Sequence, residues 1–312
     1  MKLLAIDSNS ILNRAYYGVR PLTTKDGIYT NGIYGFLTIF LKICEETAPD
    51  AVAFAFDLKA PTFRHKQYEA YKATRKGMPE ELAVQMPILK EVLAAMNVAM
   101  LECEEYEADD IIGTVARICG EEGLECDIVT GDKDDLQLAT ETTKIYLTTT
   151  SRGLTQTTVY DAAAVKQRYG VTPEEFIDVK ALMGDSSDNI PGVPGIGEKT
   201  ALSLIANNGS IETIYENLAG CGAKGAALKK LEDGRDLAFL SKQLATIDTH
   251  APVEFATGAV RREDMDSAAL YEILNRLEFK SLISRLGLTG QEADEAEALP
   301  AKDAFEGMPC RL

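Results

Sequence analysis

The sequence predicts an α/β fold whose core is a three-layer, mostly parallel sheet, followed by a smaller helical domain. Over about the first 160 of the 312 residues, short apolar runs typical of buried strands alternate with amphipathic runs typical of helices. Beyond residue 161 the helical pattern dominates. Strands that alternate with helices pair in parallel, because each crossover helix returns the chain to the same end of the sheet.

The individual elements follow from this pattern. The chain is long enough for two domains, an α/β core at 1–180 and a helical domain at 181–290. The last segment, 291–312, is acidic and Ala-rich, and we expect it to be disordered. A long helix begins after Met78-Pro79 and runs to about Met96. The expected strands lie at 3–6, 51–56, 98–101, 127–130 and 144–147, with a short edge strand at 157–160.

Composition argues against several classes of protein. No apolar run approaches the ~20 residues of a membrane span, and the six cysteines form neither a CxxC pair nor a zinc spacing. We therefore expect a cytoplasmic protein with reduced thiols. The net charge of −17 is unusual for a protein that binds nucleic acid. However, six Lys or Arg gather between Lys59 and Lys76 against one acid, Glu69, which makes this basic stretch a candidate phosphate contact.

Acidic side chains recur where predicted strands end or helices begin. Asp7 ends the first predicted strand and Asp57 follows the second. In open α/β sheets, ligands bind beyond the carboxyl ends of the strands. Carboxylates cluster at low cost only around cations, and a set without His or Cys selects Mg²⁺ or Mn²⁺. The candidate metal ligands are Asp7, Asp57, Glu107, Asp109, Asp110, Asp132, Asp134, Asp185 and Asp188.

The spacing of Glu107 and Asp109 constrains the local structure. Residues two apart do not share a helix face, so Glu107 has to lie in a non-helical entry segment if it is to face the same ion as Asp109. Asp109 and Asp110 then occupy the first turn, where the helix dipole favours carboxylates. The alternative is that these acids only complement a helix N-terminus, just as an isolated strand-end residue such as Asp7 is more often a helix cap than a ligand.

The segment 184–201 combines two carboxylates, Asp185 and Asp188, with a Pro- and Gly-rich hairpin that opens into an apolar helix. Gly195-Ile196-Gly197 stands directly before that helix. Bare backbone N–H groups at a helix N-terminus bind anions. One segment therefore combines a candidate metal site and a candidate phosphate site, which points to nucleic acid.

Together these motifs resemble the 5′-nuclease (5′→3′ exonuclease) domain of bacterial DNA polymerase I, within the flap endonuclease family. The resemblance covers about residues 1–288, with the motifs in the family's order. It implies a PIN-like core, a helical arch at about 62–96, and a helix–three-turn–helix (helix-hairpin-helix) element in the C-terminal helical domain. The matching segments are 4–8, 55–57, 63–64, 71–75, 78–82, 107–110, 130–134 and 184–201.

The resemblance implies two Mg²⁺ or Mn²⁺ ions. Asp7, Asp57, Glu107 and Asp109 would hold the first ion. The second would be held by Asp132, Asp134 and Asp185, with Asp110 and Asp188 in support. The residues implied as catalytic are Arg64, Lys72, Asp109, Asp132, Asp134 and Asp185.

The resemblance also implies contacts with DNA. Arg64 and Lys72 would clamp the scissile phosphate, while Arg75 and Lys76 would steer the 5′ strand through the arch. Tyr16 or Tyr68 would stack on an unpaired base, although ordinary packing is an equally good reading of both tyrosines. Hairpin contacts with duplex phosphate would come from Gly195, Ile196, Gly197 and Lys199, and a K⁺ would bind the carbonyls of Val193 and Ile196.

The implied function is hydrolysis of DNA phosphodiesters at 5′ flaps, nicks and 5′ ends in replication and repair. RNA primer–DNA junctions are further candidate substrates. We expect a monomer in the bacterial cytoplasm, associated with the nucleoid and either fused to or working with a DNA polymerase. Two alternatives stay open, a DNA-junction binding module that has lost cleavage and a PIN-type ribonuclease.

Overall fold

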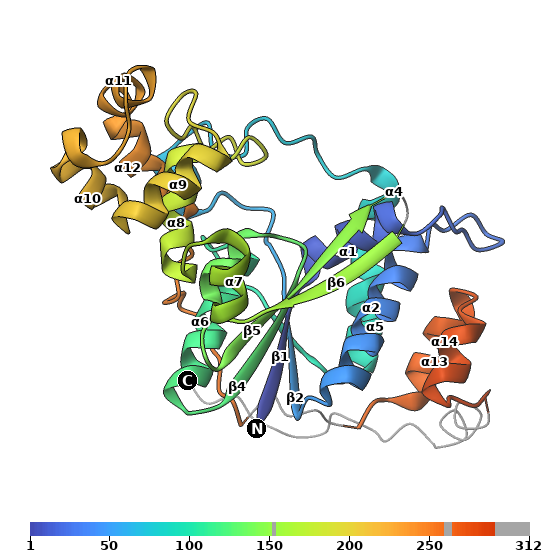
Figure 1. Ribbon diagram of the computed structural model, residues 1–312. Coiled ribbons are helices and arrows are strands. Elements are labelled where there is room, and N and C mark those ends of the chain that lie inside the picture. The colour runs from blue at the N-terminus through green and yellow to red at the C-terminus, as the bar shows by residue number, and fades with distance from the viewer. Residues whose placement is uncertain (152–153, 259–263, 291–312) are drawn as a thin grey trace, which may run out of the picture.

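The computed structural model describes residues 1–151, 154–258 and 264–290, and it contains a six-stranded sheet in the order β3-β2-β1-β4-β5-β6 (Figure 1). Neighbouring strands are parallel except for β5 and β6, which are antiparallel. The mostly parallel sheet and its edge strand are therefore confirmed. The strands are β1 (Lys2–Asp7), β2 (Ala51–Ala55), β3 (Ala99–Leu101), β4 (Glu125–Thr130), β5 (Thr143–Ser151) and β6 (Leu154–Tyr160).

Side chains that alternate along β1 divide the core between the two faces of the sheet. Leu3 and Ala5 belong to the apolar cluster that includes α6 (Ala108–Glu121), whereas Leu4 and Ile6 belong to the cluster that includes α1 and α2. Successive strand residues point to opposite faces, so a strand that is apolar at every position is buried on both sides. Helices on both faces of the sheet in Figure 1 complete the predicted three layers.

The helices fall into three groups. One face of the sheet carries α1 (Ser8–Gly18), α2 (Asn31–Thr47), α5 (Gln85–Ala95), α13 (Ser267–Arg276) and α14 (Lys280–Leu286). The opposite cluster includes α6, α7 (Ala162–Tyr169) and α8 (Pro173–Met183). The helical domain at the upper left of Figure 1 contains α9 (Glu198–Asn208), α10 (Ile211–Glu216), α11 (Ala226–Asp233) and α12 (Arg235–Ala245).

Helix α8 joins the α/β core to the helical domain. It packs against the 3₁₀ helix η1 (Asp134–Leu138) of the core and against α9 and α12; a shorter 3₁₀ helix, η2, spans Leu218–Gly220. The domain change near residue 180 stays a prediction, and the predicted tail at 291–312 lies outside the described residues. Among the residues that the structure describes, no helix has both the length and the apolar character needed to cross a membrane.

The segment 62–96 is helical only near its ends. It begins with α3 (Phe63–Gln67), continues through turns, and reaches α4 (Glu80–Ala83) and then α5. The predicted continuous helix at 78–96 is interrupted at Val84. Pro87 has no backbone N–H to donate to the carbonyl of residue 83, and its ring would clash with that carbonyl in a continuous helix. Leu89 and Val92 are fully buried, so the last part of the expected arch belongs to the core.

A buried ion pair fixes the start of this segment against α6. The Arg64 guanidinium donates to both Asp110 carboxylate oxygens at 2.7 Å and to the backbone carbonyls of Leu244 and Thr246 at 2.9 and 2.8 Å. Arg64 is 3% exposed and Asp110 is fully buried. The prediction that Arg64 clamps a phosphate does not fit this arrangement, because the guanidinium is already bound to protein acceptors.

We predict that Arg64→Ala lowers the free energy of unfolding by about 3–5 kcal/mol, because it leaves the Asp110 carboxylate buried without its partner. Urea denaturation at pH 7 measures the effect. The matched control is Lys66→Ala, which removes an ion pair to Glu105 whose side chains are both more than half exposed, and whose loss costs about 0–1 kcal/mol. Equal stability losses in the two variants would contradict the anchoring role of Arg64.

Candidate metal centre

Asp7 stands where β1 becomes α1. Its Oδ1 accepts from the Ser10 backbone N–H at 3.0 Å, and its Oδ2 accepts from the Thr130 hydroxyl at 3.2 Å. Burial, followed by the nearby Asp57 carboxylate, raises the pKa of Asp7 to about 7. The residue therefore caps α1 while it also belongs to an acidic cluster, and the two readings of a strand-end aspartate do not exclude one another.

The start of α6 has the predicted arrangement. Glu107 has an extended backbone at the N-cap position, and Asp109 and Asp110 occupy the first turn, which confirms the local geometry inferred from their spacing. Asp57, which follows the next strand of the sheet, accepts from the Ala108 backbone N–H at 2.8 Å. The free N–H groups and the dipole of the helix N-terminus favour this gathering of carboxylates.

A cavity of about 490 Å³ opens at the carboxyl edge of the sheet. Its wall combines carboxylates from β1, α6 and the loops after β2 and β4 with basic side chains from the segment before α4. Acid and base therefore face one space, although they come from distant parts of the sequence. Its lining includes Asp7, Asp57, Glu107, Asp109, Asp132, Lys72, Arg75 and Lys76.

Lys180 joins two further predicted ligands. Its ammonium lies 2.6 Å from Asp134 Oδ1 and 2.5 Å from Asp185 Oδ2. Burial and the Asp132 charge raise the pKa of Asp134 to about 7. At Asp185 burial acts in the same direction, but the Lys180 ammonium outweighs it and the pKa falls to about 2. The sequence analysis missed Lys180, and the available signal was a lysine on an apolar helix five residues before Asp185.

The basic segment neutralises the remaining acids. Lys72 Nζ lies 2.6 Å from Glu107 Oε1 and 3.8 Å from Asp188 Oδ2, while Arg75 forms an ion pair with Asp188. The Tyr71 hydroxyl donates to Glu107 Oε2 at 2.9 Å. Lys72 adopts a left-handed backbone with a φ of 55°, an uncommon conformation that the surrounding contacts hold in place. These contacts hold Glu107 and Asp188 against the basic segment.

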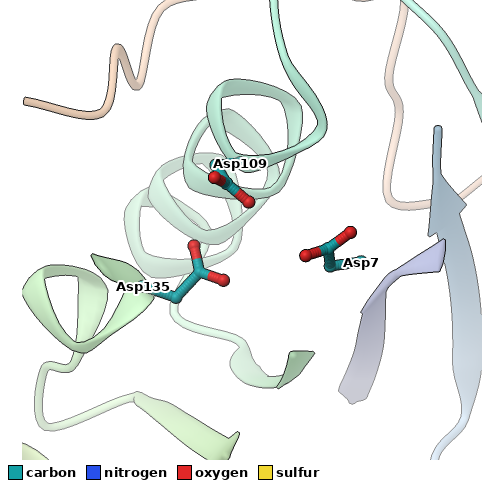
Figure 2. Close-up of side chains that lie close together, drawn as sticks. All are labelled: Asp7, Asp109 and Asp135. Carbon is teal, nitrogen blue, oxygen red and sulfur yellow. The ribbon is translucent and has the colours of Figure 1, made fainter. Parts of the chain in front are cut away.

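One carboxylate in the cluster was not predicted. Asp135 lies beside Asp7 and Asp109, and these three residues each offer an oxygen within 4.8 Å of the others (Figure 2). Asp135 is fully buried, and it was not among the predicted ligands. Buried carboxylates that converge in this way, and an ammonium that already bridges Asp134 and Asp185, suit the binding of hard divalent cations.

The hairpin that carries Asp185 is held by close backbone contacts. Asp185 and Ile190 exchange backbone hydrogen bonds of 2.9 and 2.8 Å. Gly184 and Gly192 both have positive φ, and a Cβ on Gly192 would lie 2.3 Å from the Gly184 nitrogen. No side chain larger than hydrogen fits there, so these glycines fix the direction in which Asp185 enters the site.

The second half of the hairpin leads into α9. Gly197 is the N-cap of this helix, and Gly195, Gly197 and Lys199 are exposed, whereas Val193 and Ile196 are buried. The Val193 carbonyl accepts from the Ile196 N–H at 2.9 Å, and Lys230 Nζ donates to the Gly195 carbonyl at 3.0 Å. The glycine stretch therefore stands at a helix N-terminus, as expected.

Neither predicted stacking tyrosine lines the cavity. Tyr16 packs edge-on against Tyr17 at a ring distance of 5.0 Å, and Tyr68 packs on the cluster that contains Leu244. Tyr17 is 64% exposed. Arg14, another residue that the sequence analysis missed, lines the cavity and donates to the Gly131 carbonyl at 2.8 Å; the available signal was its place on the same side of α1 as the strand-end Asp7.

Comparisons with known proteins identify the family of this chain. Residues 2–170 match the family model described as the N-terminal resolvase-like domain of 5′-3′ exonuclease, and residues 171–268 match its C-terminal SAM fold. DNA polymerase I of Caldicellulosiruptor bescii is 46% identical over 289 residues, which are 93% of this chain and 34% of that protein. The Bacillus subtilis enzyme is 41% identical over 298 residues, 96% of this chain and 34% of its own length. The chain thus spans about a third of the length of these relatives.

Solved structures with the same fold extend the comparison. A T5 5′-exonuclease with bound zinc superposes with a TM-score of 0.64 at 21% identity, covering 89% of this chain and all of that one. The catalytic core of Rad2 in complex with DNA gives a TM-score of 0.58 at 16% identity, covering 94% of this chain and 90% of the other. The two consecutive family models and the polymerase relatives place this chain in the 5′-3′ exonuclease family.

Proposed function

We propose that this chain is a metal-dependent nuclease that hydrolyses DNA phosphodiesters at 5′ flaps, nicks and 5′ ends. One observation carries the proposal: carboxylates from separate elements meet in a cavity at the carboxyl edge of the sheet, directly beside a basic segment. A phosphodiester can contact the basic side chains directly and the carboxylates through bound cations.

Two divalent ions, Mg²⁺ or Mn²⁺, fit the donor set. Bound there, they supply an activated water and stabilise the leaving oxygen of a phosphodiester. Asp7, Asp57, Glu107 and Asp109 would hold one ion. Asp132, Asp134 and Asp185 would hold the other, with Lys180 moving off the two carboxylates that it bridges. Asp110 and Asp188 support the site through Arg64, Lys72 and Arg75.

The protein's own residues position the nucleic acid. Lys72 and Arg75 contact carboxylates in this structure, and cations on those carboxylates would release both side chains toward phosphate. Lys72 then offsets charge that develops on the scissile phosphate. Arg64 contributes indirectly, because its Nη1 lies 3.4 Å from Glu107 Oε2 and helps to hold the Glu107 carboxylate in place. Arg75 and Lys76, which line the cavity, guide the 5′ single strand.

The hairpin and α9 bind the duplex side of the substrate in this proposal. The N–H groups around Gly195, Ile196 and Gly197, together with Lys199, contact phosphate. The carbonyls of Val193 and Ile196 bind a K⁺ that bridges to the same strand. Contacts of this kind recognise the backbone without reading bases, so substrate choice depends on DNA structure.

Relatives support the biological setting. A bacteriophage T5 flap endonuclease with this fold is described as a complex with DNA and metal ions, and the bacterial relatives are DNA polymerases. We infer a monomeric domain, joined to or working with a polymerase in the bacterial nucleoid, that removes flaps and RNA primers. The alternatives make different predictions: a junction-binding module binds a labelled 5′ flap with Mg²⁺ but leaves it uncut, and a PIN-type ribonuclease prefers the RNA flap.

Asp185→Asn tests the second ion. We predict that cleavage of a 5′-flap duplex falls by about 100-fold or more, while flap binding stays intact, because one charged ligand is lost and the basic wall remains. Single-turnover cleavage and fluorescence anisotropy measure the two quantities. Asp161→Asn, which changes a helix cap on α7 to an equally good one, serves as the control with wild-type cleavage. Full activity of Asp185→Asn would remove Asp185 from the metal centre.

Metal affinity should depend on pH. The pKa values of Asp7 and Asp134 are raised to about 7 in the metal-free protein, so both carboxyls carry protons at pH 6 that an ion has to displace. We expect Mn²⁺ affinity to fall between pH 8 and pH 6, by about tenfold per unit for each displaced proton below pH 7. Calorimetry in buffers of different ionisation enthalpy measures both affinity and proton release. Identical affinities at the two pH values would contradict the assignment.

The raised pKa values of Asp7 and Asp134 also determine how the stability of the metal-free protein changes with pH. A carboxyl that binds its proton more tightly when folded stabilises the protein at low pH, and that contribution is lost as pH rises from about 4 to about 7. In EDTA, we therefore expect Asp7→Asn to weaken this decline in thermal stability. A decline that is unchanged in the variant would argue against Asp7 as its source.

Lys76→Ala tests whether the basic stretch between Lys59 and Lys76 contacts phosphate. Lys76 is exposed at the cavity and forms no ion pair among the described residues, so its loss should weaken flap binding without altering the fold. We predict that the slope of log affinity against log salt becomes shallower by about 1. Lys25→Ala, an exposed lysine outside the residues that line the cavity, is the matched control and should leave the slope unchanged. A wild-type slope for Lys76→Ala would exclude this phosphate contact.

A further inference from the structure

Asp135 is a buried carboxylate to which none of the roles above gives a function. It lies in η1 with 0% of its surface exposed, and within the described part of the chain neither carboxylate oxygen has a hydrogen-bond partner. The neighbouring Thr130 hydroxyl has one proton, which it donates to Asp7. A buried carboxylate without donors is costly, so a position of this kind calls for a ligand.

The direction of the side chain identifies where that ligand would lie. Figure 2 shows the carboxylates of Asp7, Asp109 and Asp135 turned toward one another, and each offers an oxygen within 4.8 Å of the others. Around an octahedral ion with bonds of about 2.1 Å, oxygens stand about 3.0 to 4.2 Å apart. Small side-chain movements therefore bring all three oxygens onto one hard divalent cation.

The distribution of ion pairs also indicates that a cation binds between Asp7, Asp109 and Asp135. Lys72 pairs with Glu107, Arg64 with Asp110, and Lys180 with Asp134 and Asp185. Across residues 1–151, 154–258 and 264–290, by contrast, no Lys or Arg forms an ion pair with any of the three carboxylates in Figure 2. Asp7 has Asp57 and Asp132 as further acidic neighbours, and Lys72, the cation that acts on Asp109, is paired with Glu107. A divalent ion offsets the repulsion that remains.

A structural role does not account for Asp135. The side chain caps no helix, since η1 begins without a side-chain cap hydrogen bond. The residues that follow, Leu136 and Leu138, belong to the apolar core, where a leucine would pack at lower cost than an ionisable group. A charged side chain that faces the metal centre therefore stands where an apolar side chain would stabilise the core more.

We propose that Asp135 is a third carboxylate ligand of the divalent cation held by Asp7 and Asp109, an inference that rests on the proposed metal-dependent function. It binds the ion from the buried side. The coordination positions that face the cavity then stay open for water and for a phosphate oxygen. Its effect is tighter binding of a hard divalent cation in the absence of DNA.

Mn²⁺ titration of the DNA-free full chain tests the assignment, with free Mn²⁺ followed by electron paramagnetic resonance. We expect Asp135→Asn and Asp135→Leu to weaken the tighter Mn²⁺ site by about tenfold or more, with the second site less affected. In EDTA the Asp135→Leu variant should have a higher Tm than the wild type, because it removes a buried charge. This rise in Tm separates loss of a ligand from loss of the fold.

The matched control is Asp127→Asn. Asp127 is also buried on the same β4–η1 stretch and also has a carboxylate oxygen without a hydrogen-bond partner, but its charged neighbour is Lys2 at 4.0 Å. Wild-type Mn²⁺ affinity in this control supports the proposal. Equal affinity in the wild type and both Asp135 variants overturns it, as does an equal loss in Asp127→Asn. A wild-type protein that binds no Mn²⁺ would instead overturn the metal centre and the proposed nuclease with it.

Discussion

Mutual repulsion among carboxylates at the carboxyl edge of the sheet is the force that the surrounding structure has to offset. Five parallel strands end at this edge, and α6 begins there with its dipole directed at the same point. Burial, together with the charges of neighbouring carboxylates, raises the pKa of Asp7 and Asp134 to about 7. The arrangement is stable only because cationic side chains, protons or bound ions occupy the space between the carboxylates.

The cationic side chains divide into two kinds. Arg64 is buried and forms a bidentate ion pair with Asp110. It therefore stabilises the protein around the site and is not free to contact substrate. Lys72, Arg75 and Lys180 are joined to acids by ion pairs that bound cations would replace. In the proposed function, the same side chains stabilise the metal-free protein and would contact phosphate once cations occupy the carboxylates. Metal binding and DNA binding would then be coupled.

Much of the fold and most of the acidic set were predictable from the sequence. Strands β1 and β2 were predictable because a run that is apolar on both faces has few alternatives, and strand-end aspartates identify the carboxyl edge of a parallel sheet. The entry conformation of Glu107 followed from its spacing to Asp109, a local constraint of helix geometry. The glycines around Asp185 were equally readable, since a tight hairpin requires positive φ there.

The sequence by itself determined the elements, their order and which acids stand at their ends, because these depend on neighbours a few residues away. Only the tertiary structure decided how charges pair. Arg64 looked like a phosphate clamp until Asp110 and two carbonyls, 46 to 182 residues away along the chain, proved to surround it. Lys180 and Asp135 were not predicted as site residues for the same reason. The environment of a side chain in a core is set by residues from distant parts of the chain, which local periodicity does not reveal.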